Sequence, residues 1–232
     1  MDSIIRQVIE DLQVATRILV REGVIDGFGH VSARHPARPD HYFMIRDNSP
    51  PDAVEEGCFL ELDAHSAPVS VAGFRPSIER FIHGEIYRSR PDVQSVVHTH
   101  SPHLVAFSVS EVPLRPLYHM CGFLGQGAPV FDIADQHGMT DMLITSPQRG
   151  ESLATRLGAS ALVLMRGHGA TVVGASTKEA VFRAVYASVN ARIQPVVMQL
   201  GAVKFLAPEE ALLAEELHRA VVERPWNHWK KK

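Results

Sequence analysis

Helical and strand-like stretches follow one another irregularly along this chain, and that order limits the folds that it can adopt. A first predicted helix at 2–22 is followed by short stretches rich in β-forming residues, and no regular strand–helix–strand repeat develops. No linker or low-complexity segment divides the chain. Its 232 residues fit one domain or two small ones. We therefore expect residues 1–232 to form a single α/β or α+β domain.

The expected elements are short strands and helices of very different lengths. Strands are expected at 30–34, 42–46, 59–62, 68–71, 93–100, 161–165 and 170–173. Helices are expected at 2–22, 77–88, 102–108, 177–200 and 209–222. Ser77 is the expected N-cap of the second helix. Residues 111–140 contain several glycines and are expected to be irregular.

Composition and charge exclude several classes of partner. The 23 Lys and Arg residues against 26 Asp and Glu residues give a net charge of −3, so nothing favours nucleic acid or an anionic membrane. The chain has neither a run of about 18 apolar residues nor the unbroken apolar segment of a signal peptide. The two cysteines, Cys58 and Cys121, fit a reducing compartment. We therefore expect a cytoplasmic protein.

Histidine is the residue type that stands out, with thirteen in the chain. His98 and His100 end an apolar strand, where alternate side chains point to the same face and can reach one ion. His168 lies in a Gly-His-Gly turn after another apolar run, and the glycines leave its ring unobstructed. Three imidazoles are typical of a catalytic divalent-metal site. Polar residues at strand ends are the alternative explanation.

Glu79 is the carboxylate best placed to complete such a site. It lies near the start of the helix expected at 77–88, where it could move a proton or, alternatively, cap the helix. His83 follows four residues later on the same helix face, either as an outer partner of the site or as a packed, hydrogen-bonded histidine. Five other histidines lie among polar residues and are expected at the surface: His35, His41, His65, His218 and His228.

Four motifs occur in order along the chain. They are Gly-Phe-Gly-His-Val-Ser-Ala-Arg at 27–34, Arg-Pro-Ser-Ile-Glu-Arg-Phe-Ile-His-Gly-Glu-Ile-Tyr at 75–87, Val-His-Thr-His-Ser at 97–101 and Leu-Met-Arg-Gly-His-Gly at 164–169. In residues and spacing they resemble the class II aldolase/adducin family, from about residue 5 to about residue 200. The resemblance implies a three-layer α/β/α sandwich with a largely antiparallel central sheet. It also implies a homotetramer with active sites near subunit interfaces.

The resemblance assigns roles to four residues. His98, His100 and His168 match the three metal-binding histidines of the family, and Glu79 matches its catalytic acid/base. The implied cofactor is a divalent metal ion. Zinc, manganese, cobalt and iron all accept imidazole ligands, so each fits this set.

Three positions depart from the sugar-phosphate aldolases of the family, which hold the substrate phosphate with an asparagine, a Thr-Gly or Ser-Gly pair and two serines. Here His30 replaces the asparagine, Arg46 begins a segment without the pair, and Ile78 replaces the serine after Ser77. A branched alkyl group removes a hydrogen-bond donor, so a phosphate dianion is not favoured. Arg46 and His30 suit a carboxylate instead, with Ser77 kept for substrate binding.

Together with Asn-Ala-Arg-Ile-Gln at 190–194, these departures resemble a decarboxylase branch that acts on hydroxylated aromatic dicarboxylates such as dihydroxyphthalate or hydroxymethylpyridine dicarboxylate. The resemblance therefore predicts a metal-dependent, non-oxidative decarboxylase of aromatic compound catabolism, with Glu79 or His30 as the proton donor. The alternatives are an aldolase or epimerase acting on a sugar or hydroxy-acid, an iron-dependent oxygenase on the same fold, and a non-enzymatic adducin-like assembly module. Residues 226–232 are expected either to cover a neighbouring active site or to fray.

Overall fold

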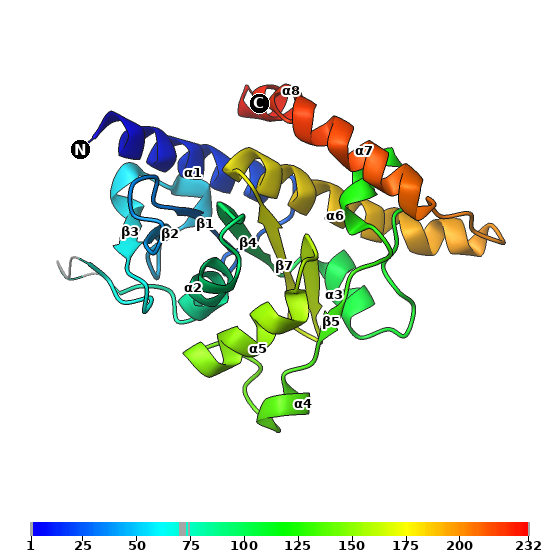
Figure 1. Ribbon diagram of the computed structural model, residues 1–232, viewed down its shortest axis with the longest axis horizontal. Helices are drawn as coiled ribbons and strands as arrows, with labels where there is room; N and C mark the ends of the chain where they lie inside the picture. The colour runs from blue at the N-terminus through cyan, green and yellow to red at the C-terminus, as the bar shows by residue number, and fades with distance from the viewer. Residues whose placement is uncertain (1, 70–72, 74, 232) are drawn as a thin grey trace.

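The computed structural model describes residues 2–69, 73 and 75–231, and a seven-stranded sheet forms its centre (Figure 1). The order of the strands in the sheet is β3-β2-β1-β4-β7-β6-β5. All neighbouring pairs are antiparallel except β5 and β6, which are parallel. The strands are β1 His30–Arg34, β2 Tyr42–Ile45, β3 Phe59–Leu62, β4 Ser95–Thr99, β5 Val130–Phe131, β6 Leu162–Met165 and β7 Gly169–Gly174.

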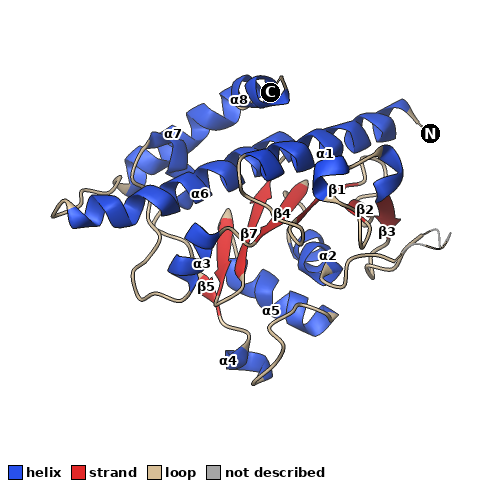
Figure 2. Ribbon diagram, turned by 180° about the vertical axis from the view of Figure 1, so that it is seen from behind, coloured by secondary structure: helices blue, strands red, loops and turns tan. Residues whose placement is uncertain are grey.

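Helices cover both faces of this sheet. Helices α1 and α6 lie side by side across one face, seen from behind in Figure 2, and α2 and α5 pack together on the other face. The α-helices are α1 Ser3–Arg21, α2 Arg80–Ser89, α3 Pro102–Ser108, α4 Ala134–His137, α5 Pro147–Leu157, α6 Thr177–Gln199, α7 Pro208–Val221 and α8 Glu223–Lys230. The short 3-10 helices are η1 Pro51–Ala53, η2 Glu56–Cys58 and η3 His119–Leu124.

Alternating residues of the central strands divide between two apolar cores. Val97 and Val172 belong to the core beneath α1 and α6, whereas Val96 and Val173 belong to the core beneath α2 and α5. This alternation follows from the two-residue period of a strand, whose successive side chains point to opposite faces. The three-layer α/β/α sandwich with a mostly antiparallel sheet is therefore confirmed. Among the described residues, no helix has both the length and the apolar character needed to span a membrane.

Most expected elements occur within one or two residues of their predicted limits, with differences at strand and helix ends. The helix expected from Ser77 begins at Arg80, so Ser77 is not its N-cap. The strand expected at 42–46 ends one residue early, and Arg46 instead forms an isolated bridge with Pro76. Part of the strand expected at 68–71 lies outside the described residues.

The segment expected to be irregular, 111–140, contains more structure than predicted. It includes η3, α4 and the two-residue strand β5, which pairs with β6 along Val130–Phe131. A strand this short carries no periodic signal of its own, and its pairing depends on a partner more than thirty residues away in sequence. The prediction of an irregular segment is therefore only partly correct.

The described residues near the C-terminus are helical and packed against the rest of the chain. Residues Glu223–Lys230 form α8, in which Trp226 and Trp229 are buried at 3% and 6% exposure. Both tryptophans belong to the core shared with α1 and α6, and the backbone carbonyl of Trp229 accepts a hydrogen bond from Arg21. These aromatic side chains pack within their own chain, so this part of the tail is not frayed, and coverage of a neighbouring active site stays a prediction.

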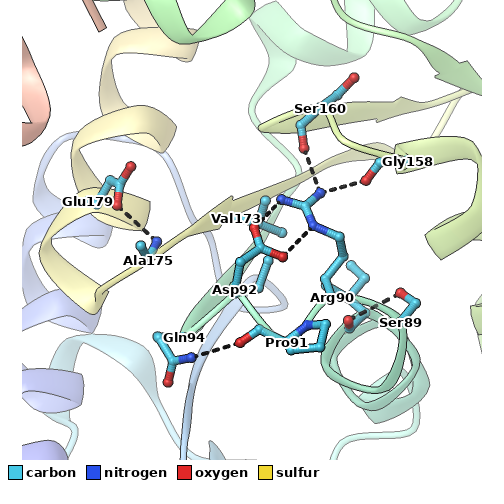
Figure 3. A network of polar contacts seen from close by, with 12 residues as sticks. Ser89, Arg90, Pro91, Asp92, Gln94, Gly158, Ser160, Val173, Ala175 and Glu179 are labelled. Atoms are coloured by element: carbon cyan, nitrogen blue, oxygen red, sulfur yellow. Dashed lines mark hydrogen bonds and ion pairs between the residues drawn. The ribbon is translucent and has the colours of Figure 1, made fainter. Parts of the chain in front are cut away.

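At one end of the sheet, polar contacts join the segments that precede two of its strands (Figure 3). Arg90 pairs with Asp92 at 2.7 Å and donates to the backbone carbonyls of Gly158 and Ser160, which joins the segment before β4 to the segment before β6. Nearby, the Glu179 carboxylate accepts a hydrogen bond from the backbone N–H group of Ala175 after β7. The predicted metal ligands lie at the opposite end of the same strands.

Candidate metal centre

The candidate metal centre lies where β4 ends and where β1 and β7 begin. His98 is in β4, His100 follows that strand, and His168 occupies the turn between β6 and β7. That turn needs its glycines: Gly167 has a positive φ of 65°, and a Cβ atom on Gly169 would lie 2.1 Å from the Thr99 carbonyl oxygen. The Gly-His-Gly sequence thus lets β7 approach the end of β4 closely.

Four side chains converge at this point. Ligand atoms of Glu79, His98, His100 and His168 all lie within 4.8 Å of one another. The Nε2 atoms of His98 and His100 are 3.0 Å apart. The Glu79 Oε2 atom lies 3.6 Å from His168 Nε2 and 3.8 Å from His98 Nε2. The structure therefore brings together the four residues that the resemblance assigns to the metal site.

The outer ring nitrogens of two of these histidines have partners that fix their orientation. The Nδ1 atom of His168 donates to the carbonyl oxygen of Met142 at 3.1 Å, and His100 Nδ1 lies 3.3 Å from Asp26 Oδ1. A proton used on Nδ1 leaves the Nε2 lone pair directed at the centre. Met142 itself has a positive φ of 68°, a conformation that non-glycine residues adopt at a cost.

The donor set suits a divalent cation. The three histidines and Glu79 each direct one possible ligand atom at the same small region. Such acceptor atoms repel one another unless a cation or protons lie between them. Nitrogen and oxygen ligands of this kind are accepted by zinc, manganese, cobalt and iron alike. The four residues could therefore hold a metal ion, and the donor atoms leave its identity open.

Asp26 joins the centre although no motif in the sequence assigns it there. Its Oδ1 atom accepts from the backbone N–H groups of Phe28 and Gly29, at 2.9 Å and 3.1 Å, and also contacts His100. An aspartate before a glycine-containing loop is a signal for a turn. Nothing in that signal points to a histidine 74 residues further along the chain. Phe28, at the tip of this loop, is 79% exposed.

The Glu79 carboxylate is directed at the centre and does not cap the helix. Although Glu79 occupies the N-cap position of α2, its side chain makes no capping hydrogen bond, and its Oε1 atom accepts from the backbone N–H group of Ile144 at 2.9 Å. Burial alone would raise the pKa of Glu79, but its interaction with His168 and the charge of His98 lower the pKa to about 2. The capping interpretation is therefore wrong, and the carboxylate is ionised.

A cavity of about 540 Å³ opens beside the candidate metal centre. It is lined by the positions that depart from the sugar-phosphate aldolase pattern, among them His30, Arg46 and Ile78, and also by Ser77. Ile78 is 54% exposed, and the Arg46 Nε atom donates to Ser49 Oγ at 3.2 Å. The Ser77 hydroxyl accepts from the backbone N–H group of Glu79 at 3.3 Å. All predicted substrate contacts therefore border the same cavity.

His30 differs from the other cavity residues because it is almost fully buried. It is the first residue of β1 and lies opposite His98 in the sheet, and its ring is 5.0 Å from the ring of His98. Its Nδ1 atom is 2.8 Å from Nε2 of His83, which is fully buried. His83 is therefore the packed, hydrogen-bonded histidine of the second interpretation, and the site residue that it contacts is His30.

Comparison with known proteins identifies the family and supports the fold. The Class II Aldolase and Adducin N-terminal domain matches residues 10–195. Decarboxylase tropJ of Talaromyces stipitatus is 40% identical, over 91% of this chain and 88% of its own length. The 3,4-dihydroxyphthalate decarboxylase of a Terrabacter species is 29% identical, over 90% of this chain and 87% of its own. A crystal structure of an aldolase II superfamily protein from Pseudomonas syringae superposes with a TM-score of 0.79 and 22% identity, covering 97% and 91% of the two chains.

This chain belongs to the class II aldolase/adducin family. Within it, the chain is an enzyme of the decarboxylase group, because it is similar over most of its length to decarboxylases and retains four groups that could hold a metal ion. The solved structure, at 22% identity, supports the fold alone.

Replacing Asp26 with alanine is expected to weaken metal binding without abolishing it. The change removes the carboxylate that orients His100, and outer partners of this kind contribute about 10–100-fold to metal affinity. Titration of zinc against a competing chelator measures the change. Asp40, an exposed aspartate outside the centre, is the control, and Asp40→Ala is expected to bind zinc as the unmodified chain does. Equal affinities for the two variants would contradict the role given to Asp26.

Proposed function

We propose that this chain is a metal-dependent, non-oxidative decarboxylase of a hydroxylated aromatic dicarboxylate. The observation that carries the proposal is the lining of the cavity: His30, Arg46 and Ile78 stand beside the four convergent groups, where a phosphate-binding aldolase has polar donors. An arginine and an imidazole suit carboxylate oxygens, and an exposed isoleucine suits the face or edge of a ring. The similarity to 3,4-dihydroxyphthalate decarboxylases supports the same substrate class.

In this proposal each side chain has a defined task. Arg46 binds the carboxylate that remains in the product, Ser77 donates a further hydrogen bond, and Ile78 contacts the ring. A bound divalent metal ion would supply Lewis-acid stabilisation of the negative charge that develops on the ring oxygen. The groups that would hold this ion are His98, His100, His168 and the Glu79 carboxylate.

Glu79 moves the proton. As an ionised carboxylate, its Oε2 atom accepts the proton of the ring hydroxyl ortho to the departing carboxylate, and then returns it to the carbon that bears that carboxylate. The bond between this carbon and the carboxylate breaks, carbon dioxide leaves, and the bonding electron pair restores the aromatic ring. His30, which lines the cavity and whose buried Nε2 atom has no hydrogen-bond partner among the described residues, is the second candidate proton donor.

The proposal is tested by incubating the metal-loaded protein with a panel of ortho-hydroxy aromatic dicarboxylates and measuring carbon dioxide release. Release from at least one member, with no oxygen consumed, supports it. Aldehyde formation from a sugar or hydroxy-acid substrate, with no release from the panel, would favour an aldolase instead. Oxygen-dependent turnover would favour an oxygenase on the same fold. The proposal also includes the homotetramer that the resemblance implies, with a small carboxylate and not nucleic acid or a membrane as the partner.

Replacing Arg46 with alanine is expected to raise KM for a dicarboxylate substrate by about 10–100-fold. A hydrogen bond to a charged group contributes about 1.5–3 kcal/mol, and each 1.4 kcal/mol corresponds to about tenfold in affinity. Steady-state kinetics with the dicarboxylate, and with the analogue that lacks the second carboxylate, measure the effect. The analogue is the control, since its KM is expected to change little. An equal rise for both compounds would show that Arg46 does not bind the second carboxylate.

A further inference from the structure

Four buried side chains form a continuous hydrogen-bonded series that leads away from the cavity. His30 Nδ1 is 2.8 Å from His83 Nε2, and His83 Nδ1 is 2.6 Å from Ser32 Oγ. Ser32 Oγ in turn is 2.7 Å from the Tyr87 hydroxyl. None of the four residues is more than 5% exposed. The cavity thus connects through His30 to a tyrosine in the core beneath α2.

Secondary structure sets the spacing of this series. His30 and Ser32 are two residues apart on β1, so their side chains point to the same face of the sheet. His83 and Tyr87 are four residues apart on α2, so they share one face of that helix. The helix lies on the sheet with these faces in contact, and two regular elements therefore hold all four groups in place.

The direction of the hydrogen bonds follows from the Tyr87 hydroxyl. Among the described residues, Ser32 Oγ is the hydrogen-bond partner that the structure shows for this buried hydroxyl, so the Tyr87 proton has one acceptor. The Tyr87 proton is then directed to Ser32, the Ser32 proton to His83 Nδ1, and the proton on His83 Nε2 to His30 Nδ1. The opposite direction would leave the buried Tyr87 proton without an acceptor among these contacts, which is costly. Burial lowers the pKa of His83 to about 3, so its ring is neutral as this order requires.

His30 is left with its proton on Nε2, the atom that has no partner among the described residues. A neutral donor at this position has an advantage over a cationic one. The His30 ring is 5.0 Å from the ring of His98, where a positive imidazolium would repel a bound cation. The Nε2–H group can instead bind an anionic oxygen without adding charge to the centre.

We propose that Tyr87, Ser32 and His83 are positioning residues that hold His30 in the tautomer with its proton on Nε2, so that the cavity offers a neutral donor to a substrate oxygen. The nature of that oxygen, a carboxylate or phenolate, rests on the proposed function. The tautomer itself depends only on the contacts of the four side chains. Tyr87 is thereby linked to substrate binding although it does not line the cavity that holds the substrate.

The test compares Tyr87→Phe with Tyr42→Phe in the zinc-loaded protein. The two tyrosines are both buried and their rings are 5.2 Å apart, but the Tyr42 hydroxyl donates to the Arg80 carbonyl and is not part of the series. Side-chain ¹⁵N NMR reports which nitrogen of His30 carries the proton. The His30 signals are identified as those that are absent from the spectrum of His30→Gln. We expect Nε2 protonation in the unmodified chain and in Tyr42→Phe, and a mixture of tautomers in Tyr87→Phe.

Ser32→Ala breaks the series at a second point and is expected to give the same mixture, which guards against a folding defect peculiar to Tyr87→Phe. In both variants KM for the carboxylate substrate is expected to rise roughly fivefold to tenfold while kcat changes much less, as loss of one hydrogen bond would cause. A His30 proton on Nδ1 in the unmodified chain, or unchanged spectra in both variants, would overturn the proposal. Because NMR needs no substrate, failure of the decarboxylase assay alone would leave this result intact.

Discussion

Replacing His98 with alanine is expected to abolish both stoichiometric metal binding and turnover. His98 is fully buried at the end of β4, and its Nε2 atom lies close to the ligand atoms of His100 and Glu79. A direct ligand contributes more than the outer partners, whose loss already costs about 10–100-fold in affinity. Metal content by elemental analysis and initial rates with the best substrate of the panel measure the two effects.

The matched control is His65→Ala, because His65 is an exposed histidine in the turn after β3 and is distant in sequence from all four ligands. This variant is expected to retain its metal and its activity. Thermal unfolding of both variants separates loss of the site from loss of the fold. Stoichiometric metal in a folded His98→Ala protein would refute the assignment of His98 as a ligand.

The parts of the fold that could be predicted from the sequence are those with a strong local signal. Helix α1 has an amphipathic pattern, and both α1 and α6 were expected within two residues of where they occur. The hairpin of β6 and β7 was expected from two apolar runs around a glycine-containing turn. The division into two cores then follows from the alternation along β4 and β7.

Where tertiary contacts decide, the sequence was a poorer guide. His35 and His218 were expected at the surface because their neighbours in sequence are polar, but they are 3% and 8% exposed. His35 stacks on Phe43 across the sheet, and His218 stacks on Phe182 of α6. An imidazole can satisfy its nitrogens locally and still bury its ring, so polar neighbours do not determine the exposure of a histidine.

The candidate site shows the same division. The spacing of His98 and His100 on a strand indicates a shared face, and the resemblance adds His168 and Glu79. The groups that orient these ligands come from elsewhere: the Met142 carbonyl belongs to a loop, and its contact with His168 depends on a strained backbone. A backbone carbonyl has no residue type to recognise, so no sequence pattern could have identified it.

Replacing Glu79 with glutamine is expected to lower kcat by about 10²–10⁴-fold, the usual contribution of a group that transfers a proton. The amide has the size of the carboxylate and can still accept from the Ile144 N–H group through its oxygen, so the start of α2 is expected to be preserved. An amide cannot take up the proton of the ring hydroxyl, because it is not a base at neutral pH. Single-turnover rates of carbon dioxide release measure the loss.

Glu85→Gln is the matched control, since Glu85 is a buried carboxylate of the same helix that pairs with Arg88 and does not line the cavity. It is expected to change kcat little. Comparison with His98→Ala then separates the two tasks of the site: a Glu79→Gln protein that keeps its metal but loses turnover locates the defect in proton transfer. If kcat instead stayed within a few-fold of the unmodified chain, Glu79 could not be the group that moves the proton, and His30 would be the remaining donor at the cavity.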